Sequence, residues 1–307
     1  MPPRLIAIDI DGTLLNSSGR ISERNLAALH LAEDRGIEIT IATGRRHCYA
    51  MRVLHDLNRP PSSVLASSNG AVIRSIDSTL VHRTHMPLST ARWLCEHIRD
   101  FHNTLVLTFD KVRPDGEEDN GVLVCEDIDA LNATLGLSMD TSYIAQVSPI
   151  EQALNDNPPI QMMLCGSIDR MRAATARLLQ DPRVRSLEIQ AARVATVETA
   201  ASPGVEVDLH CTEYPARDLC ILDILPAGCS KASAVLHLAR LRNIDPADIL
   251  AIGDNWNDVP MFCVAGHSVV MANAPADLKA LAAKEGWSLT ATNDEDGVAQ
   301  AIEAALA

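Results

Sequence analysis

The first sixty residues alternate between two hydrophobic periods. The run LIAIDI is apolar except for one aspartate, as in a buried β-strand, whereas later segments repeat their apolar positions at helical spacing. The pattern predicts strands over 5–10 and 37–42 and helices over about 23–35 and 46–57. Ser22 is predicted to cap the first helix and Gly36 to end it. Because strand and helix alternate, we expect parallel strands joined by right-handed crossovers.

The same alternation returns late in the chain, after a middle region of different character. The late segments predict strands over 249–253 and 268–272 and helices over about 231–241, 257–264, 275–285 and 296–306. The middle region predicts short strands over 105–109, 122–125, 160–165, 194–199 and 219–224, with helices over about 88–101 and 168–180. We therefore predict an α/β core with a parallel sheet, made of residues 1–83 and 225–307, and an inserted α+β domain over 84–224.

Composition narrows the kind of partner. The 307 residues are 47% hydrophobic, enough for a substantial core, and carry a net charge of −14. This charge disfavours nucleic acid and anionic membranes, both of which attract basic surfaces. No apolar run approaches the ~20 residues of a membrane helix, and an aspartate follows the start too soon for a signal peptide. We expect a cytoplasmic monomer or homodimer that binds a small molecule.

Two aspartates interrupt the first predicted strand. Asp9 and Asp11 would share the strand face opposite Ile6 and Ile8, just before a Gly-Thr pair. Ligands bind open parallel sheets outside the carboxyl ends of the strands, so both carboxylates should reach that crevice. The alternative is a pair of turn and helix-capping acids.

Two further segments offer groups suited to phosphate. Thr43 and Gly44 follow the second strand, with Arg45 beyond them, and a hydroxyl beside free N–H groups at a helix start binds anions. Ser230 and Lys231 open a predicted helix, but the spacing of a nucleotide-binding P-loop is missing. Taken singly, Thr43 favours an ordinary N-cap, Arg45 a surface ion pair and Lys231 a solvated surface lysine.

The segment GDNWNDVPM adds further carboxylates. Asp254 ends an apolar strand, and Asn257 and Asp258 open the next helix, so that both carboxylates can face one crevice. Converging carboxylates repel one another unless a hard cation lies between them, and Mg²⁺ prefers oxygen ligands. The aspartates at the strand ends therefore predict a metal ion.

The order of these segments carries a family resemblance. DIDGTLL, TGR, the lysine of GCSKAS and GDNWNDVPM resemble the four ordered motifs of the haloacid dehalogenase superfamily. The inserted domain resembles the type IIB cap of its Cof-like phosphatases, in layout rather than in motif. The resemblance covers nearly all of residues 5–83 and 225–303 and implies a Rossmann-like core.

The resemblance also implies roles for single residues in a Mg²⁺-dependent phosphatase. Asp9 would be the nucleophile that forms an aspartyl-phosphate, and Asp11 the general acid and base. Asp9, the main-chain carbonyl of Asp11 and Asp254 would hold Mg²⁺, while Asp258 orients Lys231 or a metal-bound water. Catalytic contacts to phosphoryl oxygens are implied for Thr43 and Lys231, and substrate contacts for Gly44, Arg45, Asn69, Gly70 and Asn257. For Asn69, a simple turn residue is the alternative.

The expected substrate is a small phosphorylated metabolite, either a sugar phosphate or a phosphorylated cofactor such as a flavin or pyridoxal phosphate. Two other functions stay open: a phosphomutase of the same subclass, and a non-catalytic protein that binds phosphorylated metabolites. Intact Asp9, Asp11, Lys231 and Asp254 argue against the second of these.

Overall fold

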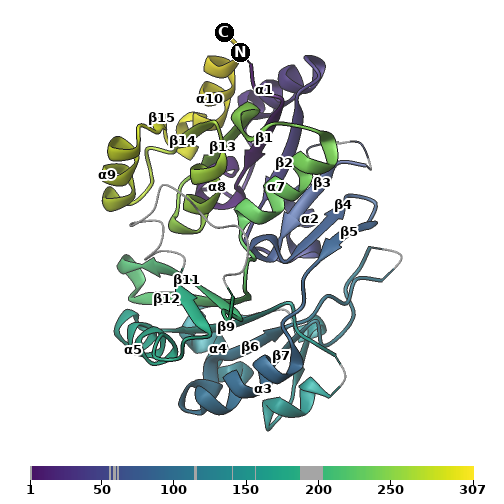
Figure 1. Cartoon of the computed structure of the whole chain (residues 1–307), viewed down its shortest axis with the longest axis vertical. Helices are drawn as coiled ribbons and strands as arrows, with labels where there is room; N and C mark the ends of the chain where they lie inside the picture. Colours follow the sequence, from purple (N-terminus) through teal and green to yellow (C-terminus); the bar gives the residue numbers. More distant parts are fainter. Residues whose placement is uncertain are drawn as a thin grey trace. The chain divides into compact units, whose positions relative to one another are not determined.

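A computed structural model describes residues 2–54, 57, 60, 62–113, 116–139, 141–155, 157–186 and 203–307 (Figure 1). The chain divides into two compact units. The first unit holds residues 1–81 and 230–307, and the second holds the described residues of 82–188 and 200–229. Within the described ranges, no helix is both long and apolar enough to cross a membrane.

The first unit is built on an eight-stranded sheet. Its strand order is β15-β14-β13-β1-β2-β3-β4-β5. The strands are β1 (Leu5–Ile8), β2 (Glu38–Ala42), β3 (Val64–Ser67), β4 (Val72–Ser75), β5 (Leu80–Arg83), β13 (Ile249–Gly253), β14 (His267–Val270) and β15 (Ser288–Leu289). The six strands from β15 to β3 run parallel, and β4 returns antiparallel to β3. The predicted parallel α/β core is confirmed.

Helices cover both faces of this sheet, because successive strand residues point to opposite sides. The helices are α1 (Glu23–Asp34), α2 (His47–Leu54), α7 (Lys231–Arg242), α8 (Val259–Val264), α9 (Ala276–Glu285) and α10 (Gly297–Leu306). Ile6 and Ile8 pack in the cluster that includes α1, α2 and α10, whereas Leu5 and Ala7 pack with α7, α8 and α9. The predicted caps form as well, since the side chains of Ser22 and Ser230 accept N–H groups of the first turns of α1 and α7.

The first strand is shorter than predicted. It ends at Ile8, and residues Ile10–Leu14 form a wide, irregular turn in which Asp11 and Gly12 have non-helical dihedral angles, with Gly12 at φ +73°. Asp9 and Asp11 therefore follow the strand instead of sharing its face. Ile10 still packs in the same cluster as Ile6 and Ile8, so the hydrophobic pattern located the core correctly and misplaced only the end of the strand.

The second unit has a mostly antiparallel sheet in the order β10-β11-β12-β9-β6-β7-β8. Its strands are β6 (Leu105–Thr108), β7 (Leu123–Cys125), β8 (Ile144–Gln146), β9 (Gln161–Gly166), β10 (Val184–Ser186), β11 (Val207–Tyr214) and β12 (Leu219–Pro226). Among the described strands of this second sheet, only the pairs β10–β11 and β7–β8 are parallel. The strand predicted over 194–199 lies outside the described residues.

Among the described residues, three α-helices pack on that sheet: α3 (Leu88–His97), α4 (Ile128–Leu135) and α5 (Ile168–Leu178). Side chains of α3 and α5 share a core with Leu107 and Leu222, while α4 packs in a separate cluster with Val106. Two short helical turns, η4 (Arg99–Thr104) and η6 (Ile150–Leu154), flank these elements. The predicted helix over 88–101 is thus shorter and continues as η4. The α+β character predicted for the inserted region is confirmed.

Candidate active site

The predicted site residues come from five segments of the first unit. Asp9 and Asp11 follow β1, Thr43 to Arg45 follow β2, Asn69 and Gly70 lie in the turn Ser68–Gly70 after β3, Lys231 opens α7, and Asp254 to Asp258 follow β13. Since β1, β2, β3 and β13 are parallel, their carboxyl ends meet at one edge of the sheet. Four of the five segments thus begin at that edge.

Lys231 lies at the centre of the charged groups. Its side chain is completely buried, and Nζ lies 2.7 Å from Asp9 Oδ1 and 2.6 Å from Asp258 Oδ1. Burial alone lowers the pKa of the ammonium, but the two carboxylates outweigh it and raise the pKa of Lys231 above its usual value. The lysine is therefore charged, and its interpretation as a solvated surface residue is wrong.

Asp258 connects the lysine to the loop after β13. While Oδ1 accepts from Lys231, Oδ2 accepts the backbone N–H groups of Asp254 at 2.9 Å and Asn255 at 3.0 Å. Three donors satisfy this carboxylate, which has no exposed surface. Asp258 thus fixes both the ammonium of Lys231 and the backbone that carries Asp254.

Asp254 is held by a residue to which the sequence analysis gives no role. Thr13 is fully buried and donates its hydroxyl proton to Asp254 Oδ1 at 2.9 Å. Gly12 leaves room for this contact, because a Cβ there would lie 2.4 Å from Asp254 Oδ2. The sequence does carry a signal for this role of Thr13. It is a hydroxyl residue that directly follows a turn glycine, in a segment that already holds two aspartates.

Three carboxylates lie close to one another, and two of them contact the ammonium of Lys231. Oxygen atoms of Asp9, Asp254 and Asp258 all lie within 4.8 Å of one another. Burial, more than any charge, raises the pKa of Asp9 to about 7, and burial together with the neighbouring aspartates raises the pKa of Asp254 well above its usual value. A single buried lysine leaves an excess of negative charge that a divalent cation would neutralise. This donor set of hard oxygens fits Mg²⁺.

Asp11 behaves differently from Asp9. Its side chain is 58% exposed and forms a bidentate ion pair with Arg45, whose Nε lies 2.7 Å from Oδ2 and whose Nη2 lies 2.5 Å from Oδ1. The Arg45 guanidinium also lies 4.8 Å from the centre of the Tyr49 ring. Asp9 is thus buried, whereas Asp11 is exposed and pairs with an arginine whose own side chain is only 17% exposed.

The remaining predicted residues shape the edge of the site. Thr43 Oγ1 accepts the N–H of Arg45 at 3.1 Å, and the Nδ2 group of Asn257 donates to Asn69 Oδ1 at 3.3 Å. A Cβ on Gly44 would lie 3.2 Å from Asn69 Oδ1. The structure therefore brings Gly44, Asn69 and Asn257 together.

Gly70 allows its turn to approach α7. It has φ +89°, and a Cβ there would lie 2.1 Å from the carbonyl oxygen of Ser230. Asn69 also has a positive φ of 51°, so it adopts the turn conformation that the sequence analysis gave as the alternative to substrate contact. Both residues fit the turn onto the start of α7, beside Lys231.

Taken together, a sheet edge that collects aspartates around a buried lysine and a chain interrupted by an α+β unit define a class of hydrolases. A family model of haloacid dehalogenase-like hydrolases matches residues 6–194 and 211–302. The chain therefore belongs to this family. The predicted Cof-like hydrolase is confirmed, and so is the prediction of a phosphatase enzyme.

Relatives of known name match along the whole chain. A 5-amino-6-(5-phospho-D-ribitylamino)uracil phosphatase of Bacillus subtilis is 29% identical and is covered over 98% of its length by 99% of this chain. Another Bacillus subtilis phosphatase is 27% identical, with coverage of 98% of this chain and 99% of the relative. A sugar phosphatase of subclass IIB shares the fold with a TM-score of 0.69 at 21% identity, over 98% of each chain.

Proposed function

We propose that the protein is a Mg²⁺-dependent phosphatase that hydrolyses small phosphorylated metabolites through an aspartyl-phosphate on Asp9. The observation that carries this proposal is the position of Asp9. It is a buried carboxylate in contact with the Lys231 ammonium, in a cluster that has more negative than positive charge. A cation would offset the excess negative charge around this carboxylate, and the phosphorus atom of a bound phosphate would be the electrophile that the carboxylate attacks. A phosphate bound to a metal ion supplies both.

Asp9, Asp254 and the main-chain carbonyl of Asp11 would hold the Mg²⁺. Asp258 has both oxygens engaged by Lys231 and by backbone amides, so it would contact the metal only through water. When bound, the ion supplies positive charge that offsets repulsion between the nucleophile and the phosphate dianion.

The two carboxylate oxygens of Asp9 have different roles in the proposed reaction. Lys231 binds Oδ1, which leaves Oδ2 to attack phosphorus while the bond from phosphorus to the leaving oxygen breaks. Because the ammonium favours the ionised carboxylate, Lys231 also opposes the rise in the pKa of Asp9 that burial causes. The same ammonium, together with the Thr43 hydroxyl, would bind the phosphoryl oxygens.

Asp11 is suited to proton transfer because it is exposed. It would protonate the leaving alkoxide in the first step and accept a proton from the attacking water in the second. Its partner Arg45 lies at the same edge, and an arriving phosphate dianion would compete with Asp11 for the guanidinium. Binding of substrate would thereby free the acid for its role.

The names of two relatives support a proposal for the substrate class. One is named for a phosphoribityl-amino-uracil and another is a sugar phosphatase, so both leaving groups are polyhydroxylated. We propose sugar phosphates, or phosphorylated cofactors and their precursors, as substrates of this protein. The second unit, as an inserted cap, would select the leaving group.

Phosphate release from a substrate panel tests this function. The panel holds sugar phosphates, nucleotides, flavin mononucleotide and pyridoxal phosphate, each assayed with Mg²⁺ and with EDTA. We expect release from a few members, only with Mg²⁺. Release that EDTA leaves unchanged would contradict the metal role, and no release from any member, with or without a sugar bisphosphate activator, would contradict the phosphatase.

A further inference from the structure

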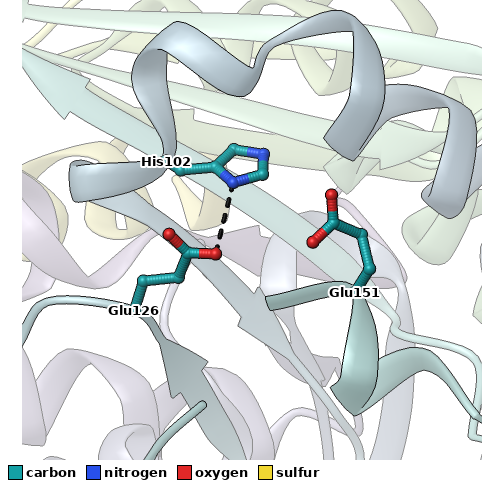
Figure 2. A group of neighbouring side chains, drawn as sticks. All are labelled: His102, Glu126 and Glu151. Carbon is teal, nitrogen blue, oxygen red and sulfur yellow. Dashed lines mark ion pairs between the residues drawn. The ribbon is translucent and has the colours of Figure 1, made fainter. Parts of the chain in front are cut away.

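A second convergence of ligand-type side chains lies in the second unit. His102 comes from η4, Glu126 follows β7, and Glu151 lies on η6; Figure 2 shows the three side chains pointing toward one another. One possible ligand atom from each lies within 4.8 Å of the other two. The three segments are far apart in sequence, so the packing of the unit creates this cluster.

The imidazole is oriented as a metal ligand usually is. The side chain of His102 is only 10% exposed, and Nε2 lies 2.8 Å from the carbonyl oxygen of Cys95. A carbonyl only accepts, so Nε2 carries the proton and donates it. In the neutral ring the lone pair is then on Nδ1, which faces Glu126 Oε1 at 3.3 Å. A lone pair facing a carboxylate oxygen requires a positive charge between them or on the ring.

One carboxylate oxygen of the two glutamates has no hydrogen-bond partner among the described residues. Glu126 Oε1 accepts the backbone N–H of Ile150 at 2.7 Å, which orients that carboxylate. Glu151 Oε1 lies 3.4 Å from the exposed guanidinium of Arg99, but its Oε2 is buried and has no hydrogen-bond partner in the described part of the chain. A buried carboxylate oxygen without a hydrogen-bond partner is costly, and a cation bound within the cluster would remove that cost.

We propose that His102, Glu126 and Glu151 form a binding site for a divalent transition-metal ion. One imidazole nitrogen and two carboxylate oxygens form a donor set that suits Mn²⁺, Fe²⁺, Co²⁺ or Zn²⁺, whereas Mg²⁺ and Ca²⁺ prefer oxygen alone. The carbonyl of Cys95 acts as the outer partner that fixes the ring tautomer of a metal-bound histidine.

This site shares no residue with the catalytic cluster, and its role would be structural. A bound ion would join η4, the segment after β7 and η6 around one centre, and so stabilise that part of the second unit. It would thus raise the unfolding temperature without taking part in phosphoryl transfer.

Co²⁺ binding to the metal-free full-length chain tests the site, because the visible spectrum of Co²⁺ distinguishes imidazole and carboxylate ligands from thiolates. Binding is measured by equilibrium dialysis in excess Mg²⁺ for the wild type and three variants. Glu151→Gln removes a ligand, and Asp254→Asn disables the catalytic cluster. Glu213→Gln is the matched control, since Glu213 pairs with the exposed Arg172 as Glu151 pairs with Arg99.

We expect one Co²⁺ ion without thiolate bands in the wild type, in Asp254→Asn and in Glu213→Gln, and affinity lowered by about 10- to 100-fold or more in Glu151→Gln. Should Glu151→Gln fold poorly, Glu126→Gln replaces it, because its amide oxygen still accepts the Ile150 N–H. Unchanged Co²⁺ affinity in these variants, no binding in the wild type, or loss in Asp254→Asn would overturn the proposal. The cluster would then be an ion pair between a protonated His102 and Glu126.

Discussion

The catalytic cluster and the His102 cluster both bring carboxylate oxygens together, but they differ in how those oxygens are hydrogen-bonded. In the catalytic cluster every carboxylate has assigned donors: Lys231 binds Asp9, Thr13 binds Asp254, and three donors bind Asp258. In the His102 cluster one glutamate oxygen is buried with no hydrogen-bond partner among the described residues. The first cluster is therefore positioned before any ligand arrives, as transition-state stabilisation requires. The second would be completed by its ligand.

The largest expected effect comes from Asp9→Asn. The amide keeps the size of the side chain but cannot form the acyl-phosphate, so turnover should fall by on the order of 10⁴-fold or more. Circular dichroism should show an unchanged fold, and Co²⁺ binding at the His102 cluster should persist. Glu303→Gln, which alters an exposed ion pair with Arg24, is the control and should keep full activity. Full activity in well-folded Asp9→Asn would exclude the nucleophile assignment.

Lys231→Met should have the largest effect on stability. It leaves the buried carboxylates of Asp9 and Asp258 without their cation, which costs about 3–5 kcal/mol when one partner of a buried pair is removed. Urea unfolding at pH 8 measures this loss. His102→Gln should cost less, because Glu151 and Glu126 keep 22% and 19% of their side-chain surface in water. If both variants lose the same free energy, the two clusters do not differ in charge burial as inferred.

The elements of the core and the order of the motifs could be predicted from the sequence, because they depend on local pattern. Strand and helix periods located β2, β13 and α7, and Ser230 marked the start of α7. The sequence alone left Lys231 as either a solvated or a functional residue. The burial of Lys231 depends on packing between segments more than two hundred residues apart. The hydrophobic pattern within one segment cannot predict such packing.

Three features escaped sequence reasoning for the same reason. The bidentate pair of Arg45 with Asp11 and the bond from Thr13 to Asp254 join segments that only the sheet brings together. His102, Glu126 and Glu151 have no motif spacing at all, since each comes from a different irregular segment. Motifs reveal chemistry that is repeated across a family, whereas such contacts require the fold.

The stability of the metal-free protein should depend on pH through the aspartates of the catalytic cluster. The folded-state pKa of Asp9 is about 7, above its value in an unfolded chain, so the protonated form favours folding. The stabilising contribution is complete below about pH 4, the ordinary aspartate range, and is lost as the pH rises through 7. Metal-free protein should therefore lose stability across that interval, and Asp254 adds to the loss in the same direction.

Mg²⁺ should reverse this loss, because the ion competes with protons for the same carboxylates. Thermal unfolding with and without Mg²⁺ at pH 5 and pH 8 measures the effect, and the Mg²⁺-induced rise in unfolding temperature should be larger at pH 8. The Asp9→Asn and Asp254→Asn variants should show a smaller difference between the two pH values. An equal Mg²⁺ effect at both pH values in the wild type would mean that these aspartates do not hold the ion.

The smallest expected effect is that of Thr13→Val, which tests how far preorganisation matters in the catalytic cluster. Valine fills the same space but removes the hydrogen bond to Asp254 Oδ1, at a cost of about 1 kcal/mol in stability. Because that bond holds down the pKa of Asp254, its loss should favour protonation and weaken Mg²⁺ activation by about 10-fold. Thr13→Ser, which keeps the hydroxyl, should retain most of the Mg²⁺ activation of the wild type. Titration of activity against Mg²⁺ distinguishes this from a general packing defect, since a defect would lower the maximal rate in both variants without shifting the Mg²⁺ midpoint.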